Sequence, residues 1–122
     1  MDDAYVALAE MGRVYAHPTR LRILDVLAEG EACVCHLTFV LGQRQAHVSQ
    51  HLRLLKDAHL VIDRREGLMV YYRLADARAV AVVSLLKDLL RPGDPEVTFP
   101  SVPAPPVPGC PCPRCGNADK CA

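Results

Sequence analysis

Two cysteines separated by one residue, Cys33 and Cys35, are the most chemically suggestive pair in the chain. Thiolates bind soft ions, and a single ion needs its sulfur ligands close together. Residues two apart on a regular helix point to nearly opposite sides, because neighbours on one face are three or four apart. The pair can therefore bind one ion only if the start of its helix distorts, and we expect that distortion to be the switch. The alternative is that both are small buried apolar residues.

Four more cysteines lie at the C-terminal end: Cys110, Cys112, Cys115 and Cys121. They follow a proline-rich stretch, 92–109, which predicts an extended, semi-rigid linker rather than a packed element. In a polyproline-like form it spans roughly 50 Å, enough to return the cysteines to the first pair in either chain of a dimer. The four could instead close a separate tetrahedral zinc site. The sequence thus predicts a domain over 1–91, a linker over 92–109 and a metal-binding tail over 110–122.

Composition limits the function further. The 122 residues carry no net charge, yet 44–73 is rich in arginine, as suits a surface for a polyanion. No signal peptide or membrane-spanning run is recognisable, so we expect a cytoplasmic protein whose thiols are metal ligands or reactive groups. There is no nucleophile-and-base set outside the thiols and no phosphate loop, so an enzyme is not expected.

Apolar periodicity predicts a mainly helical chain with one small hairpin. The predicted helices cover 4–15, 18–28, 35–41 and 45–58, and a last helix runs from a cap at Asp76 to Leu90. Strands are expected at 61–65 and 69–74. A tight turn at Gly42 joins the third and fourth helices, as in a helix-turn-helix. The last helix has an apolar surface broader than one small core needs, which predicts a second copy of the chain.

These elements, in this order, predict a winged helix-turn-helix, and four sequence segments resemble the ArsR/SmtB family of metal-responsive repressors. The segments are His17-Pro18-Thr19-Arg20-Leu21-Arg22-Ile23-Leu24, Cys33-Val34-Cys35, His47-Val48-Ser49-Gln50-His51-Leu52-Arg53-Leu54-Leu55 and Val70-Tyr71-Tyr72-Arg73-Leu74. The resemblance covers about residues 5–90 and implies a homodimeric repressor of double-stranded operator DNA.

The fourth helix would then lie in the major groove, with arginines of the hairpin over phosphate or the minor groove. Glutamine pairs with adenine, arginine with guanine, and serine with either base or phosphate. The candidate DNA contacts are Arg44, Gln45, His47, Ser49, Gln50, His51, Arg53, Arg64 and Arg65. Their plainer interpretation is a solvated helix face and a charged edge strand. The helix lacks a Ser, Thr, Asp or Asn cap, which leaves its first residue undefined.

In the resembled family a Cys-Val-Cys at this position is the inducer site of arsenite sensors and of cadmium or lead sensors. Trivalent arsenic takes three sulfurs, and cadmium and lead take three or four, so the tail must supply the rest. The expected ligands are Cys33, Cys35, Cys110, Cys112, Cys115 and Cys121. The inducer is expected to be As(III) in the form of arsenite, or its antimony counterpart antimonite, with Cd(II) or Pb(II) as an alternative. A third alternative is a thiol redox sensor or a tail held by structural Zn(II).

His36 stands where the family usually has Asp, and we expect it to be a solvated helix residue. The family's other metal site, on the last helix, is not expected: Asp76 matches it, but Arg78, Leu89 and Pro92 cannot bind metal. The dimer is expected to form through the first and last helices. Its expected interface residues are Leu8, Met11, Val82, Val83, Leu86, Leu89 and Leu90.

Overall fold

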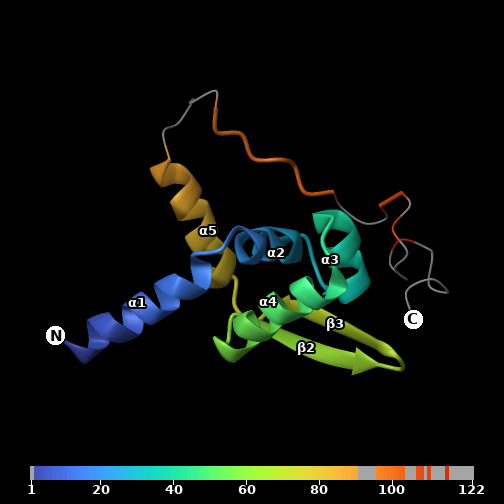
Figure 1. Ribbon diagram of the computed structural model, residues 1–122, viewed down its shortest axis with the longest axis horizontal. Helices are drawn as coiled ribbons and strands as arrows, with labels where there is room; N and C mark the ends of the chain where they lie inside the picture. The colour runs from blue at the N-terminus through green and yellow to red at the C-terminus, as the bar shows by residue number, and fades with distance from the viewer. Residues whose placement is uncertain (1, 91–95, 104–106, 109, 111–114, 116–122) are drawn as a thin grey trace.

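The computed structural model describes residues 2–90, 96–103, 107, 108, 110 and 115. Its elements follow the predicted order, with boundaries within about two residues of those expected (Figure 1). They are α1 (Asp3–Tyr15), α2 (Pro18–Ala28), β1 (Ala32–Cys33), α3 (Val34–Leu41), α4 (Gln45–Asp57), β2 (Val61–Glu66), β3 (Met69–Leu74) and α5 (Arg78–Leu89). The fold is a winged helix-turn-helix, as predicted.

One strand was not expected. β1 pairs with β3, so the predicted two-stranded hairpin is part of a three-stranded antiparallel sheet in the order β1-β3-β2. In this register Cys33 lies opposite Tyr71 and Ala32 lies opposite Tyr72. A two-residue strand has no periodicity from which it could be recognised, so its existence depends on the edge that β3 offers.

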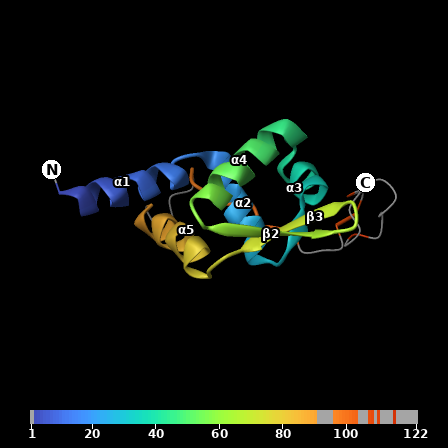
Figure 2. The same cartoon turned by 90° about the horizontal axis from the view of Figure 1, so that it is seen from below.

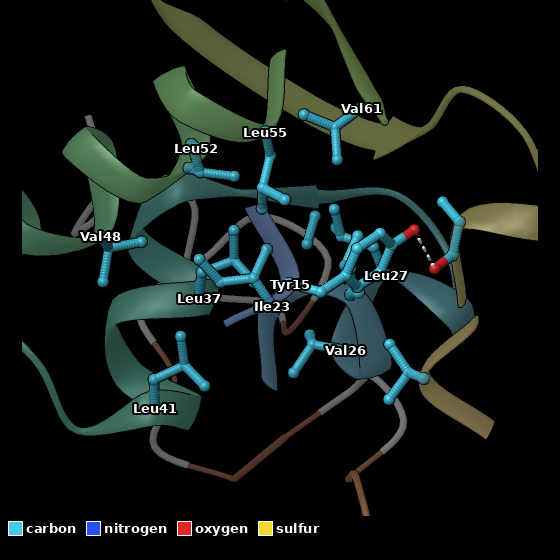
Figure 3. Close-up of a cluster of buried hydrophobic side chains, with 14 residues drawn as sticks. Tyr15, Ile23, Val26, Leu27, Leu37, Leu41, Val48, Leu52, Leu55 and Val61 are labelled. Atoms are coloured by element: carbon cyan, nitrogen blue, oxygen red, sulfur yellow. Dashed lines mark hydrogen bonds between the residues drawn. The ribbon is translucent and has the colours of Figure 1, made fainter. Parts of the chain in front are cut away.

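The main core lies where α2, α3 and α4 meet above the sheet (Figure 3). Ile23 of α2, Leu37 of α3 and Leu52 and Leu55 of α4 are fully buried there. Each comes from the apolar stripe of its helix, with the spacing of three or four that places side chains on one face. Packing against α2 and α3 therefore fixes the orientation of α4 relative to the sheet.

Local signals set the helix ends. Pro18 occupies the first turn of α2, and the His17 side chain accepts a hydrogen bond from the Thr19 backbone N–H at that end. Gly42 ends α3 in the left-handed conformation, at φ 65°, which glycine adopts without steric cost. The turn into α4 is therefore short, and α3 and α4 form the predicted helix-turn-helix.

Two helices flank this core. α1 projects beyond the body of the molecule, and its last turn lies next to α5 (Figure 2). The junction is held by Tyr15, whose buried hydroxyl donates a 2.8 Å hydrogen bond to the Ala79 carbonyl oxygen. Leu8 and Met11 of α1 are exposed, whereas Val83 of α5 is buried in the chain's own core.

The chain after α5 packs more than a simple linker would. Residues 96–103 run over α2 toward α3 (Figure 1). Val102 packs against the main core, and the Lys87 ammonium lies 5.0 Å from the centre of the Phe99 ring. The segment forms no helix or strand, and its described residues other than Val102 are exposed, so the extended linker stays a prediction, with Val102 as a packed residue in its described part. No helix among the described residues is long and apolar enough to cross a membrane.

Replacing Tyr15 with Phe removes the bond that joins α1 to α5 and leaves the buried Ala79 carbonyl without that donor. We expect a loss of about 1–2 kcal/mol in the free energy of unfolding. Urea titration at one fixed chain concentration measures it. Tyr5→Phe is the matched control, because Tyr5 is 67% exposed on the same helix and should lose less than about 0.5 kcal/mol. Equal losses in the two variants would contradict the role of the Tyr15 hydroxyl.

Candidate metal site and nucleic-acid interface

The sulfurs of Cys33 and Cys35 lie 3.1 Å apart. This contradicts the expectation that the two side chains point apart, because Cys33 is not on the helix. It belongs to β1 and forms the N-cap of α3 with an extended backbone, at φ −84° and ψ 165°. The change from strand to helix between the two residues turns both sulfurs to one side. No distortion of α3 is needed to bring them together.

Cysteines of the tail reach the same place. Cys110 is fully buried and shares a second cluster with Cys33, Tyr71 and Val107. Cys35, Met69 and Cys115 pack against this cluster. The expected return of the tail to the first cysteine pair therefore occurs within one chain for Cys110 and Cys115. Cys112 and Cys121 lie outside the described residues.

The oxidation states of the cysteines differ. Cys35 is disulfide-bonded, whereas Cys33, Cys110 and Cys115 keep their thiols. A thiophilic ion binds the thiolate, so Cys35 must be reduced before it can act as a ligand.

His36 is buried, at 2% exposure, and the prediction that it is a solvated residue is wrong. Its Nδ1 atom lies 3.4 Å from the Cys110 sulfur and 3.6 Å from the Cys115 sulfur. These three donor atoms lie within 4.8 Å of one another, close enough for one metal ion. The sequence contained a signal for this: His36 and Leu37 precede Val40 and Leu41 by one turn, which places His36 on the apolar stripe of α3.

The DNA-facing candidates divide into exposed and buried residues. Arg44, Gln45, His47, Gln50 and Arg53 are exposed, and Ser49 is half-buried. His51 is only 6% exposed and faces the interior, so the structure does not place it with the candidate contacts. Arg44 is the N-cap of α4 and makes no side-chain cap, as the sequence predicted.

His51 belongs to a group of three neighbouring imidazole rings that are tilted or edge-on to one another. Its centre lies 4.1 Å from that of His17 and 4.5 Å from that of His47. The Arg20 guanidinium is 3.1 Å from His51 Nδ1. Burial, and after it the positive charges of His17, His47 and Arg20, together lower the pKa of His51 to about 4. His51 is therefore held neutral near neutral pH.

The two hairpin arginines lie in different surroundings. Arg64 forms ion pairs with Glu31, just before β1, and with Glu66, two residues later on β2 itself. Its guanidinium also lies 4.6 Å from the centre of the Tyr71 ring. Both carboxylates raise the pKa of Arg64. The neighbouring Arg65 is exposed and has no ion pair among those found in the described part of the chain.

The comparisons with known proteins agree with this fold. Residues 17–63 match the family described as bacterial regulatory protein, arsR family. An HTH-type transcriptional regulator of Methanocaldococcus jannaschii is 38% identical over 88 residues, which are 71% of this chain and 99% of that protein. The chain belongs to the arsR family.

Two more arsR-family relatives carry functional names. The arsenical resistance operon repressor of Escherichia coli is 43% identical over 67 residues, 54% of this chain and 57% of that protein. The arsenic resistance transcriptional regulator ArsR1 of Pseudomonas putida is 41% identical over 85 residues, 63% of this chain and 66% of that protein.

Solved structures support the same assignment. The Rv0081 protein of Mycobacterium tuberculosis has a TM-score of 0.69 at 30% identity, covering 74% of this chain and 91% of that one. The homodimeric winged helix-turn-helix DNA-binding domain Mb0332 of Mycobacterium bovis has a TM-score of 0.65 at 30% identity, covering 83% and 97%. The protein is thus a transcriptional repressor of the arsR family with a DNA-binding fold, and it is not an enzyme.

Asp76 stands where the family's last-helix metal site begins. Its carboxylate accepts hydrogen bonds from the Arg78 backbone N–H and guanidinium. Hydrogen bonds from the Arg78 side chain and backbone N–H lower the pKa of Asp76 to about 2. Ala77, and not Asp76, is the N-cap residue of α5, although the Asp76 carboxylate accepts from the first backbone N–H of that helix and is occupied by an arginine of its own chain. Pro92 lies outside the described residues.

The buried His51 gives a pH-dependent stability that can be measured. Its pKa in the folded protein, about 4, is below the ordinary value of 6.5, so the unfolded chain binds the proton more tightly. Stability from this group is complete above pH 6.5 and falls as the pH drops toward 4, by up to about 3 kcal/mol. His51→Gln should remove that part of the slope. Parallel unfolding free energies of the two proteins between pH 7 and 4.5 would contradict it.

Proposed function

We propose that this repressor binds an inverted repeat in operator DNA as a homodimer and dissociates when arsenite or antimonite binds Cys33, Cys35 and a thiolate of the tail. In this proposal the domain over residues 1–91 binds DNA and dimerises. The linker over 92–109 connects it to the tail over 110–122, which supplies metal ligands. The observation that carries it is the 3.1 Å separation of the Cys33 and Cys35 sulfurs inside a cluster that also contains the buried Cys110. The names of the E. coli and P. putida relatives support the choice of arsenite.

The chemistry of capture is a ligand exchange. Three cysteine thiols replace the three hydroxyls of arsenous acid, giving three As–S bonds and three molecules of water. Two of the sulfurs already lie side by side, and the third must come from the tail. Cys35 must first be reduced, because only a thiolate can form such a bond.

The coupling to DNA binding runs through the sheet. Cys33 is paired with Tyr71 of β3, and β3 forms the hairpin with β2. Arg64 of β2 reaches back to Glu31, two residues before Cys33. Closing three As–S bonds at one end of this set moves β1 relative to β3 and so reorients the hairpin and α3. By linkage, operator DNA must weaken arsenite binding by the factor by which arsenite weakens DNA binding.

The proposed DNA surface is the exposed side of α4 with the hairpin beside it. Arg44, Gln45, His47, Gln50 and Arg53 are exposed there. The backbone N–H groups at the start of α4 have no side-chain cap, so a DNA phosphate can accept from them. On the hairpin, Arg65 suits phosphate better than Arg64, whose charge is already balanced by two carboxylates.

The proposed dimer uses the apolar faces of α1 and α5. Exposed apolar residues on these helices include Leu8 at 65%, Leu86 at 41% and Leu89 at 81%. An apolar surface of this size on two adjacent helices is typical of an interface between copies. The homodimeric Mb0332 domain, with the same fold, supports the assignment.

Two alternatives remain for the signal. Cadmium or lead would use the same pair with one or two tail thiolates, which the thiol-rich cluster also suits. A thiol redox signal is favoured by one observation, the disulfide at Cys35. Comparing oxidant with arsenite on fully reduced protein separates the redox alternative from ion binding.

The arsenite proposal predicts how serine variants behave. Wild type should leave an operator fragment when arsenite is added, with apparent affinity falling at least tenfold. Cys33→Ser and Cys35→Ser should bind the fragment normally and stay bound, because each leaves one sulfur too few. Fluorescence anisotropy on reduced protein measures this.

A chain that ends at Pro108 tests the tail and should also stay bound. Cadmium and lead are titrated in parallel with arsenite, so that release by cadmium at far lower concentration identifies that ion as the inducer. Release of both serine variants by arsenite would contradict the assignment of the sensor.

The hairpin arginines provide a matched pair for DNA binding. Arg65→Ala should weaken operator binding and lower the slope of log affinity against log salt by about one, because one phosphate contact is lost. Arg64→Ala removes the same side chain from the adjacent position and should leave the slope unchanged. The same loss of slope in both variants would show that Arg64 also contacts phosphate.

A further inference from the structure

We propose that His36, Cys110 and Cys115 form a second site, distinct from the Cys33–Cys35 pair, that takes a borderline divalent ion with Zn²⁺ as its natural occupant. The site uses no atom of Cys33 or Cys35, and it joins α3 to the tail. It therefore goes beyond arsenite release, and its metal binding is measured separately from that function, although both draw on cysteines of the tail.

The donor geometry suits zinc. Zn–S bonds of about 2.3 Å and Zn–N bonds of about 2.0–2.1 Å, at a tetrahedral angle, place a sulfur about 3.6 Å from a nitrogen. The two Nδ1–sulfur distances are 3.4 and 3.6 Å. The two nitrogen–sulfur distances therefore match those of a zinc site, and all three donor atoms lie within 4.8 Å of one another. These contacts can also be made by S–H groups hydrogen-bonded to the imidazole, and the experiment below distinguishes the two.

The charges also suit a divalent ion. His36 and Cys110 are 2% and 0% exposed, so the site lies in the interior. One neutral imidazole and two thiolates around Zn²⁺ sum to zero charge, which makes burial of the assembled site far less costly than burial of the thiolates alone. Arsenite, by contrast, bonds to three sulfurs and gains nothing from a nitrogen donor. The nitrogen thus separates the ion class of this site from that of the Cys33–Cys35 pair.

Backbone hydrogen bonds position the two described cysteines of the tail. The Val107 backbone N–H donates a 3.1 Å hydrogen bond to the Cys115 sulfur, and the Cys110 N–H donates to the Val107 carbonyl oxygen. A backbone N–H directed at sulfur stabilises the thiolate that a metal needs, as the outer contacts of metal sites usually do. The described residues supply three donors, and a water or a further tail thiolate would complete a tetrahedron.

A resident zinc would assign the cysteines of the tail to two different ions. With Cys110 and Cys115 on zinc, the tail is anchored against α3, beside the arsenite pair. The third sulfur for arsenite must then come from Cys112 or Cys121, or arsenite must displace the zinc. Zinc release during an arsenite titration decides between these two.

The test uses Co²⁺ as a spectroscopic substitute for zinc on the full-length, metal-free, reduced chain. Wild type should bind one Co²⁺ per chain, with intense visible bands of tetrahedral geometry and thiolate-to-metal charge transfer in the ultraviolet. Zn²⁺ should displace it. His36→Ala, Cys110→Ser and Cys115→Ser should each lower affinity at least tenfold, and Cys33→Ser should leave it unchanged.

Cys115 is only half-buried, so Cys115→Ser keeps the test valid if His36→Ala or Cys110→Ser does not fold. Folding of each variant is checked by circular dichroism. No tetrahedral Co²⁺ spectrum in wild type would overturn the proposal and leave the contacts as hydrogen bonds. Binding that survives His36→Ala but is lost in Cys33→Ser would overturn it too, since the ion would then sit at the arsenite pair. Neither result depends on whether arsenite releases DNA.

Discussion

The pairing of Cys33 with Tyr71 is the constraint on which the sensing region depends. It holds Cys33 in an extended conformation, so that α3 starts at Val34 and the sulfurs of Cys33 and Cys35 meet. It also brings Tyr71 into the cluster that receives Cys110. Without this two-residue strand, α3 could extend back through Cys33 and the two sulfurs would separate. The metal chemistry therefore rests on a backbone pairing.

Strand β3 connects the strand that carries Cys33 with the hairpin. β3 pairs with β1 on one side and with β2 of the hairpin on the other. Arg64 spans them, with ion pairs to Glu31 and Glu66 and its guanidinium over Tyr71. An exposed ion pair contributes little to stability by itself, but it links two segments whose relative position matters. A ligand shifts such an arrangement only through its different affinity for the two states. The proposed switch is therefore assigned to the sheet rather than to a distorted helix.

The helices and the hairpin could be predicted because their apolar residues repeat with the periods of helix and strand. β1 could not, since two residues show no period. His36 was misjudged from its polarity, although its position on the apolar stripe of α3 gave the better indication. His51 was grouped with its exposed neighbours on α4. It follows His47 by one turn, but the His51 side chain is buried whereas the His47 side chain is exposed. The number of residues in the linker predicts the distance that it can span. The position of Cys110 depends on packing, which the sequence does not give.

The docking of residues 96–103 changes what the tail has to do. A flexible tether gives its end an effective concentration that falls as its length grows. Val102 packs against the core, and Phe99 lies beside Lys87. Cys110 and Cys115 lie at the cluster beside α3, and the Val107 backbone N–H donates a hydrogen bond to the Cys115 sulfur. Part of the entropy of bringing these distant residues together is therefore lost on folding, before any ion arrives. In the two proposed sites, the donor atoms, sulfur alone or sulfur with nitrogen, would then decide which ion each part of the cluster selects.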